Sequence, residues 1–417
     1  MAGPGALLLV ALALVGAPLF VIIGAGAMLG FSREGIDLSV LAIEFFGIAE
    51  TPVLVAIPLF TFAGFLLSEG GAPHRLVRLS RALFGWLPGG LAMISLAVCA
   101  LFTAFTGASG VTIIALGALL FPALVEAGYE RRFSLGLITA SGSLGLLFAP
   151  SLPLILYGVV AETPIDKLFL AGILPGLLMV ALLAAYGFIR NRHTAMPLVG
   201  GREVLRAVLD AKWELPLPGV VLGGIYSGYF AISEAAAVTA LYVLVVELAV
   251  LREIRWRSLP RIVRESMVLV GAILTILGMS LASTNYLIDT GVPQRLFELT
   301  SSYVSGRDTF LLALLVFLLI LGAILDIFSA IVLVVPLIVP VALEYGVDPV
   351  HLGIVFLAAM ELGYLTPPVG LNLFIASHRF QEDIVQIYLA TVPFLLVLLV
   401  SVVIITFWPA LSLFLVG

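Results

Sequence analysis

Charged side chains are scarce in this chain of 417 residues, in which lysine, arginine, aspartate and glutamate together make up 11%. A soluble domain carries about 25%, so the composition excludes an ordinary water-soluble fold. The only lysines, Lys167 and Lys212, do not follow a glycine, which excludes the G-K-[ST] phosphate loop of ATP-driven pumps. Cys99 is the only cysteine, which excludes an internal disulfide and a cysteine metal cluster.

Apolar residues dominate instead, at 62% of the chain. Apolar runs of about 20 residues, the length that crosses the hydrocarbon core of a bilayer, recur from Gly5 to Leu415. We therefore predict an all-α polytopic membrane protein whose whole length is one membrane domain. The first run, from Ala6 to Leu29, has no basic residue before it and is long for a signal peptide, so we expect a retained first helix.

The basic residues fall mainly on one side of the predicted spans. Positively charged loops stay in the cytoplasm, which places sixteen of the 20 Lys and Arg residues on that side. The N-terminus is then cytoplasmic and the C-terminus periplasmic. The segment from Arg75 to Arg81 has leucines at helical spacing and is expected to be an amphipathic helix on the cytoplasmic surface. The sixteen are Arg75, Arg78, Arg81, Arg131, Arg132, Arg190, Arg192, Arg202, Arg206, Lys212, Arg252, Arg255, Arg257, Arg261, Arg264 and Arg379; the other four are Arg33, Lys167, Arg295 and Arg307.

Two apolar stretches are interrupted in the middle. The stretch between two cytoplasmic arginine groups is broken at Thr106–Gly110, and a later stretch is broken at Leu325–Ser329. The first stretch has both ends on one side, so it makes an even number of crossings. Two full helices would satisfy this, and so would a re-entrant hairpin, because irregular backbone is tolerated at depth inside protein. The glycine-rich turn favours two re-entrant helical hairpins, at about residues 88–128 and 309–345.

The chain aligns with itself without gaps at a displacement of 218 residues. Five glycine or proline pairs then coincide, and the two hairpins superpose. The displacement also superposes a cytoplasmic connection on a periplasmic one, which predicts the inverted-topology repeat of secondary transporters. The pairs are Pro122–Pro340, Gly128–Gly346, Gly145–Gly363, Pro150–Pro368 and Pro175–Pro393.

The repeat divides the chain into three predicted segments. The first repeat covers 1–190, a cytoplasmic linker with the start of a connecting helix covers 191–218, and the second repeat covers 219–417. An extra crossing is predicted near 215–230.

A helix interrupted by glycine and proline follows each hairpin, at about 134–160 and 350–378. Proline removes a backbone donor and glycine removes the steric preference for helix, which frees carbonyl oxygens. Carbonyl oxygens that are free of helix hydrogen bonds can coordinate a sodium ion, and the N-termini of half-helices attract carboxylates. Glycine, serine and proline also serve close packing between helices. Packing alone would not make them recur at a fixed displacement, so we predict two sodium sites. Each site lies between the tip of a hairpin and the interruption in the helix that follows it. The predicted sodium ligands are Thr106, Gly107, Ser109, Ser141, Gly142, Gly145, Asp326, Ser329, Gly363 and Thr366.

The predicted cavity contains no basic side chain, because every lysine and arginine lies in a loop or a surface helix. An unpaired anion buried there would cost several kcal/mol or more. Bound sodium, half-helix N-termini and polar side chains are therefore expected to hold a carboxylate substrate. The predicted substrate-binding residues are Ser109, Ser143, Ser151, Thr366 and Asn372.

Two acidic residues are predicted at membrane depth, where an ionisable group is costly and usually functional. Asp326 is an ion ligand, the N-cap of the returning half-helix, or both. Glu361 is a candidate proton carrier, which leaves a proton-coupled carboxylate transporter as the alternative. Glu126, Glu234 and Glu247 lie nearer to predicted helix ends and are expected to be interfacial or capping residues.

One enzyme motif is present, because Gly107–Gly110 fits the G-x-S-G pattern of rhomboid-type intramembrane serine proteases. A serine nucleophile needs a base within hydrogen-bond reach, and all the histidines fall in predicted loops or at helix ends. We therefore expect no enzyme activity, no cofactor apart from the coupling sodium ions, and no nucleic-acid partner. The histidines are His74, His193, His351 and His378.

Two segments are specific enough to carry a family resemblance, ASGSLGLLFAPSLP at 140–153 and TPPVGLNLF at 366–374. With four further segments they resemble the large, DctM-like permease subunit of TRAP (tripartite ATP-independent periplasmic) transporters. The likeness covers essentially the full chain. One departure is Ala231–Glu234, where the family often has Thr-Pro-Thr-Glu, which puts the local turn in doubt. The further segments are 104–129, 168–178, 222–240 and 325–340.

The resemblance implies two protein partners, a small four-helix TRAP membrane subunit and a periplasmic substrate-binding protein. It also implies an elevator-type mechanism, in which the hairpins and broken helices move as a transport domain against the other helices, with sodium as coupling ion. The substrates of the family are mostly organic acids, including dicarboxylates, sialic acids, keto acids and sulfonates. The expected function is therefore uptake of an organic acid through the lipid bilayer of a bacterial or archaeal cytoplasmic (inner) membrane.

Overall fold

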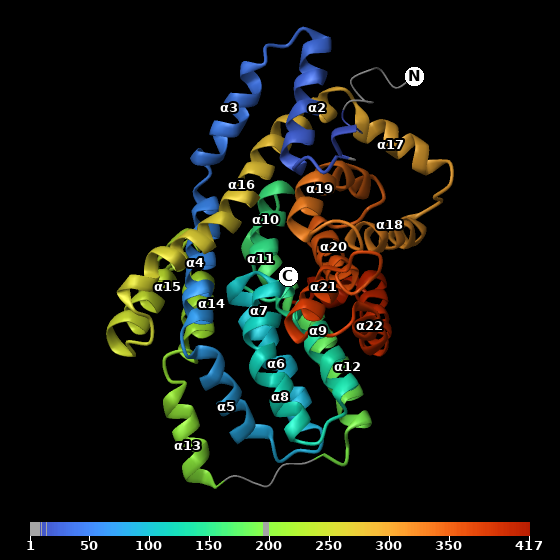
Figure 1. The fold of residues 1–417 in the computed structure, drawn as a ribbon. Coiled ribbons are helices and arrows are strands. Elements are labelled where there is room, and N and C mark those ends of the chain that lie inside the picture. The colour runs from blue at the N-terminus through green and yellow to red at the C-terminus, as the bar shows by residue number, and fades with distance from the viewer. Residues whose placement is uncertain (1–8, 10, 14, 195–199) are drawn as a thin grey trace.

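Helices account for the regular structure of this protein. The computed structural model describes residues 9, 11–13, 15–194 and 200–417. Within these ranges there is no β-strand, and helices from the two halves of the chain lie side by side at the centre of the molecule (Figure 1). The predicted all-α class is confirmed.

The described residues include six helices that are long and apolar enough to cross a membrane, and two bent pairs raise this number to as many as eight. The chain is therefore a multi-pass membrane protein, as its composition predicts. The six are Pro52–Glu69, Ile165–Arg190, Ile232–Val250, Trp256–Asp289, Ile327–Glu344 and Ile384–Phe407; the bent pairs are Ser109–Ala115 with Gly117–Glu126, bent by 48°, and Arg131–Leu147 with Leu152–Val160, bent by 44°.

The first apolar run is not one helix. Gly16 lies in a turn with a left-handed conformation (φ 82°), and helix α2 (Leu19–Glu34) begins after Pro18. Glycine with positive φ ends a helix readily, and proline cannot donate a backbone hydrogen bond to a preceding turn. The prediction of a single helix from Ala6 to Leu29 is therefore wrong. Residues 6–8, 10 and 14 of that run lie outside the described residues.

Residues 90–126 form a helical hairpin. Its first arm is α6 (Gly90–Thr106), which ends at Gly107 in a left-handed conformation (φ 64°). Its returning arm consists of α7 (Ser109–Ala115) and α8 (Gly117–Glu126). Both parts of the returning arm pack against α6, so the hairpin begins and ends at the same end of the molecule (Figure 1).

A second hairpin is formed by α18 (Arg307–Gly322) and α19 (Ile327–Glu344), which pack against each other. Its bounds are related to those of the first hairpin. Helices α7 and α8 run from 109 to 126, and α19 runs from 327 to 344, so both ends of the returning arm recur 218 residues later. The bounds of the helices and the glycine and proline pairs in the sequence thus repeat at the same displacement.

Each hairpin is followed by a broken helix. The first consists of α9 (Arg131–Ser141), a 3-10 turn and α10 (Leu152–Val160). The second consists of α20 (Pro349–Gly363) and α21 (Leu371–Phe380). Helices α9 and α20 begin at positions 218 apart. The segments between the paired helices are called the first break (142–151) and the second break (364–370). The 3-10 turn is Leu144–Leu147.

The remaining helices flank this centre (Figure 1). Helix α4 (Ala56–Glu69) packs against α15 (Ile232–Val245) and α16 (Leu259–Asp289), and α16 also packs against α2. Helix α22 (Ile384–Phe407) packs against α9 and α12 (Ile173–Arg190). The other helices are α3 (Ser39–Gly47), α5 (Ala72–Phe84), α11 (Ile165–Ala171), α13 (Gly201–Asp210), α14 (Pro216–Tyr226), α17 (Val292–Ser301) and α23 (Pro409–Leu413), with 3-10 turns at Ile48–Glu50, Pro52–Val55 and Trp256–Ser258 and a π-helical turn at Val246–Val250.

The connecting segment near 215–230 contains only the short helix α14, which has 11 residues. At 1.5 Å per residue its length is about 16 Å, whereas the hydrocarbon core of a bilayer is about 30 Å thick. Helix α14 alone is therefore too short for the extra crossing that the sequence predicts.

Candidate functional site

The tip of the first hairpin lies directly against the first break. A Cβ atom on Gly145 would stand 2.5 Å from the Ala104 amide nitrogen, so only glycine fits there. The Thr103 hydroxyl lies 2.9 Å from the Gly142 carbonyl oxygen and 2.7 Å from the Thr112 hydroxyl. The Thr103 hydroxyl therefore joins the first arm of the hairpin both to the returning arm and to the break.

The predicted sodium ligands of the first half are buried at this contact. Thr106, Ser109 and Ser141 are all buried, and the Thr106 hydroxyl has no hydrogen-bond partner among the described residues. A Cβ atom on Gly142 would stand 3.4 Å from the Ser109 carbonyl oxygen. The structure thus brings Ser109 of the tip close to Gly142 of the break, and the tip also contains the buried, unpartnered Thr106 hydroxyl.

The tip of the second hairpin contacts the second break through its backbone. The Ala323 carbonyl oxygen accepts hydrogen bonds from the amides of Val369 and Gly370, at 3.2 and 3.4 Å. A Cβ atom on Gly363 would lie 2.6 Å from the Gly322 Cα atom. Both halves of the chain therefore place a hairpin tip against the break that follows it.

Asp326 caps the returning arm α19. Its Oδ1 atom accepts bonds of 3.0 Å from the amides of Phe328 and Ser329, and the Ser329 hydroxyl donates to Oδ2 at 2.5 Å. The Ile327 amide donates to the Tyr364 hydroxyl at 2.9 Å. The capping interpretation of Asp326 is confirmed, and an ion at this tip would share the carboxylate with the donors of the helix.

Two predicted substrate residues bond within their own segments. The Ser151 hydroxyl donates to the Leu146 carbonyl oxygen at 2.5 Å, and the Thr366 hydroxyl donates to the Leu362 carbonyl oxygen at 3.0 Å. In the part of the chain that the structure describes, no hydrogen bond joins either side chain to the opposite half. Their hydroxyl groups stabilise the irregular backbone of the breaks.

Asn372 links the two halves of the site. Its Nδ2 atom lies 3.4 Å from both the Thr139 carbonyl oxygen and the Ser143 hydroxyl oxygen. Its Oδ1 atom is buried and has no partner among the described residues. An unpaired buried acceptor costs about 1–3 kcal/mol, so this oxygen is available to a donor or a cation. Asn372 and Ser143, predicted from opposite halves for substrate binding, are therefore brought together.

Glu361 is buried on α20, with 1% of its surface exposed. Neither carboxylate oxygen has a hydrogen-bond partner among the described residues. Helix α20 packs against the 3-10 turn of the first break. The Leu147 backbone amide of this turn is a nearby donor, but a buried carboxylate with so little compensation is costly, so this position is a candidate for binding a cation or a proton.

Basic side chains remain at the edge of this region. Arg379, in the last turn of α21, donates from Nε to the Ile114 carbonyl oxygen on α7 at 3.1 Å and is exposed. Arg379 and His378 line an open cavity of about 660 Å³ between α7 and α21. Arg379 is thus an exposed lining residue of this cavity, and its Nε atom bonds across from α21 to α7.

The geometry needed for a serine protease is absent among the described residues. His351 is a buried histidine, but its ring nitrogens lie 3.2 Å from the Ser412 hydroxyl and from the Thr406 carbonyl oxygen. No described imidazole bonds to Ser109. Ser109, the serine of the G-x-S-G motif, therefore has no imidazole base among the described residues.

A buried ionic cluster on α5 is not predicted by the sequence analysis. Arg75 has only 12% of its side chain exposed and lies 2.5 Å from Glu214 and 3.4 Å from Glu247, and it also pairs with Glu253. Burial lowers the pKa of Arg75, but its bonds to Glu214 and Glu253 more than offset this, so its pKa is raised. The predicted amphipathic helix is present as α5, and Arg75 belongs to its buried side together with Leu76 and Leu79.

Two predictions for acidic residues have opposite outcomes. Glu234 is a capping residue, because its carboxylate accepts a bond of 2.9 Å from the Ala231 amide. Glu247 is fully buried beside Arg75, so its prediction as interfacial or capping is wrong. The partners of Arg75 lie 139 to 178 positions away in the sequence, and no local spacing could have identified them.

A family profile described as the DctM component of the tripartite ATP-independent periplasmic transporter matches residues 5–411. The chain belongs to this family. A C4-dicarboxylate TRAP transporter large permease protein DctM of Pseudomonas aeruginosa is 37% identical over 94% of this chain and 92% of that protein. An ectoine/5-hydroxyectoine TRAP transporter large permease protein of Ruegeria pomeroyi is 32% identical over 98% of this chain and 97% of that protein.

A longer relative, the isethionate TRAP transporter permease protein DctMQ of Oleidesulfovibrio alaskensis, is 35% identical over 97% of this DctM chain and 64% of that protein. The fold is similar to that of the YdaH transporter of Alcanivorax borkumensis, with a TM-score of 0.62, 16% identity and coverage of 89% of this chain and 87% of that chain. The chain is a TRAP large permease and not an enzyme, so the protease alternative is wrong.

Proposed function

We propose that this DctM permease takes up a small organic acid as part of a three-component transporter. Relatives are named for C4-dicarboxylates, isethionate and ectoines, and the first two support a small organic anion as substrate. A periplasmic binding protein would deliver the substrate, and a small four-helix membrane subunit would complete the permease. The DctMQ relative, of which this chain covers 64%, supports a close association between a large and a small subunit.

The coupling ion is sodium, bound at two sites between the hairpin tips and the breaks. The observation that carries this proposal is a repeated contact. Gly145 approaches Ala104, and Gly363 approaches Gly322, so the same tip-against-break packing occurs twice at a displacement of 218 residues. Each contact collects carbonyl and hydroxyl oxygens, which a hard cation requires, at the end of a half-helix.

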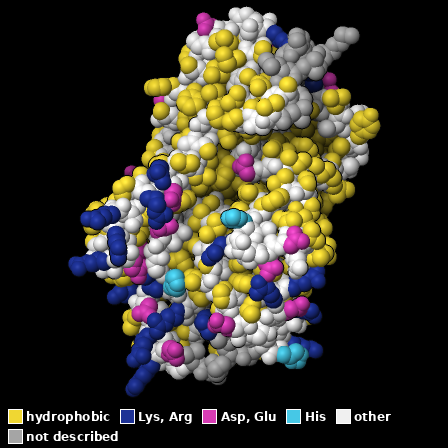
Figure 2. Space-filling model, in the orientation of Figure 1, with side chains coloured by type: hydrophobic (Ala, Val, Ile, Leu, Met, Phe, Trp, Pro, Cys, Tyr) yellow, Lys and Arg dark blue, Asp and Glu magenta, His cyan; other side chains and the backbone are white. Residues whose placement is uncertain are grey.

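The two hairpins and two broken helices form a mobile transport domain in an inverted-topology repeat. Helices α2, α4, α15 and α16, which pack against one another, form the frame against which this domain moves as an elevator. The basic side of the chain faces the cytoplasm of a bacterial or archaeal cell. Figure 2 supports this orientation, because lysine and arginine gather where α13 and the connection between α15 and α16 lie in Figure 1.

Reconstitution tests both the partners and the ion. The permease is placed in proteoliposomes, alone and with a candidate small subunit and binding protein, and uptake of a C4-dicarboxylate is measured with and without a sodium gradient. We expect uptake only with both partners and sodium. Ser109→Ala and Asp326→Ala should each weaken the sodium dependence. Full uptake by the permease alone, or an unchanged sodium dependence in both variants, would contradict the proposal.

A proton-coupled transporter of the same architecture is the second candidate, and Glu361 supports it. Its buried carboxylate has two unpartnered oxygens, which is the environment of a proton carrier. Uptake driven by a proton gradient alone in sodium-free buffer would make Glu361 the coupling residue in place of the two sodium sites.

A further inference from the structure

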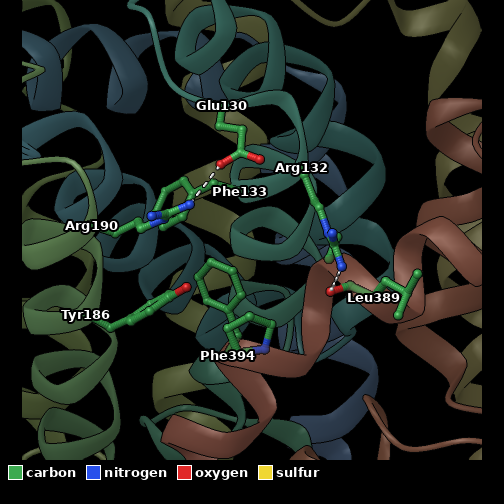
Figure 3. A pocket seen from close by; sticks show the side chains of 9 residues that line it. Glu130, Arg132, Phe133, Tyr186, Arg190, Leu389 and Phe394 are labelled. Atoms are coloured by element: carbon green, nitrogen blue, oxygen red, sulfur yellow. Dashed lines mark hydrogen bonds and ion pairs between the residues drawn. The ribbon is translucent and has the colours of Figure 1, made fainter.

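A cavity of about 280 Å³ lies outside the site described above, between the start of α9, the end of α12 and α22. Figure 3 shows Arg190 beside Glu130 on one side of this cavity and Arg132 on the other. The rings of Tyr186 and Phe394 line its inner part. Two guanidinium groups therefore surround an aromatic pocket.

The charges around the cavity favour an anion. Arg190 lies 3.3 Å from the Glu130 carboxylate, and both side chains are more than half exposed. Arg132 donates to the Leu389 carbonyl oxygen at 3.0 Å and has no carboxylate partner among the described residues. Two arginines thus face one acidic group. The neighbouring Arg131 differs, because it pairs with Glu382 at 2.5 Å.

The cavity opens onto an apolar stripe of α22. Leu389 lines the cavity and is 51% exposed. Further exposed aliphatic residues lie before and after it at helical spacing, on the same face of a helix that is long and apolar enough to span a membrane. A guanidinium pair at the end of such a stripe offers positive charge to a headgroup and aliphatic surface to a hydrocarbon chain. These residues are Val385, Val392, Leu396 and Val400, which are 46% to 55% exposed.

We propose that this cavity binds an anionic phospholipid. The headgroup phosphate takes the free donors of Arg132 and Arg190, the glycerol region rests on Tyr186 and Phe394, and an acyl chain follows the stripe from Leu389. Basic pockets between membrane-spanning helices on the cytoplasmic side commonly hold anionic headgroups. A soluble phosphate or carboxylate would use the arginines alone, whereas a phospholipid bound at the same place also uses the aliphatic stripe that adjoins the cavity.

Native mass spectrometry of the full-length permease in detergent tests this site. Phosphatidylglycerol is titrated into the wild type, the double variant R132Q/R190Q and the matched control Arg131→Gln, whose guanidinium is already paired. We expect the wild type and the control to bind one more phosphatidylglycerol than the double variant, whose affinity for this lipid falls roughly tenfold or more. Phosphatidylcholine with the same acyl chains should bind weakly, and glycerol 1-phosphate should not displace the bound lipid.

The proposal is overturned by equal phosphatidylglycerol binding in all three proteins, or by equally tight binding of phosphatidylcholine. Displacement of the lipid by glycerol 1-phosphate would assign the cavity to a soluble oxyanion instead. If the double variant does not fold, the single variants R132Q and R190Q are compared with Arg131→Gln. Lower affinity in both supports the site, and unchanged affinity in both excludes it.

Discussion

Gly363 approaches Gly322 so closely that a Cβ atom on Gly363 would lie 2.6 Å from the Gly322 Cα atom. The residues 218 positions earlier are Gly145 and Ala104, and a Cβ atom on Gly145 would lie 2.5 Å from the Ala104 amide nitrogen. Cβ atoms essentially never approach other heavy atoms below 3.0 Å. Each broken helix therefore packs this closely against its hairpin only because it carries no side chain at this position, which is the end of α20 for Gly363 and the first break for Gly145.

Adding one methyl group at either position should disturb this contact. Gly363→Ala and Gly145→Ala are expected to destabilise the protein by about 1–3 kcal/mol, as overpacking does, and to lower uptake. Thermal unfolding in detergent and uptake in proteoliposomes measure both effects. Gly271→Ala on α16 is the matched control, because its Cβ atom would meet nothing within 4 Å. Equal stability of Gly363→Ala and the control would refute this packing.

The Asn372 side chain should contribute to substrate binding. Asn372→Ala removes a buried acceptor and a contact with Ser143, so we expect substrate affinity to fall roughly tenfold, as for loss of one good hydrogen bond. Ser143→Ala should have a smaller effect. Thr391→Val is the control, since the buried Thr391 hydroxyl donates only within its own helix. The substrate affinity of each purified variant is measured by equilibrium binding. Equal affinity in all the variants would show that Asn372 does not bind the substrate.

The positions of both hairpin tips and both breaks were accessible from sequence because their signals are local. Thr106–Gly110 and Leu325–Ser329 interrupt apolar runs, and helices end at these segments. Gly16 and Pro18 give the same kind of signal within the first run, and α2 begins directly after Pro18. Glycine and proline residues within an apolar run therefore identify where helices end, provided that every one of them is considered.

Contacts between distant segments could not be predicted in the same way. The sequence predicts the amphipathic helix that carries Arg75, but it does not predict the three glutamates from other segments that surround this arginine. The link from Asn372 to Ser143 spans 229 positions. Both residues could be proposed as polar groups of a cavity, but only the packing of α21 beside α9 brings them together.

Removing Arg75 should destabilise the protein strongly. Arg75→Gln leaves Glu214 and Glu247 buried without their cation, and breaking a buried pair in this way costs about 3–5 kcal/mol. Arg78→Gln is the control, because Arg78 and Asp210 are 58% and 44% exposed and an exposed pair contributes about 0–1 kcal/mol. Thermal or denaturant unfolding separates the two variants. Similar losses in both would show that the cluster is not a stabilising element.

Glu361→Gln should retain sodium-stimulated uptake if sodium is the coupling ion. The amide has nearly the same shape and removes the cost of burying a charge, so we expect thermal stability to stay equal or rise. Uptake is measured with a sodium gradient and, separately, with a proton gradient. A folded variant that has lost sodium-stimulated uptake would instead make Glu361 a coupling residue.

The central claim is that bound sodium supplies the positive charge that holds a carboxylate between the two breaks. Calorimetric titration of the purified transporter with a C4-dicarboxylate, at several sodium concentrations and constant ionic strength, tests it most directly. We predict that substrate affinity rises with sodium concentration, and that substrate raises the affinity for sodium by the same factor, as linkage requires. A substrate affinity that is independent of sodium would contradict the account.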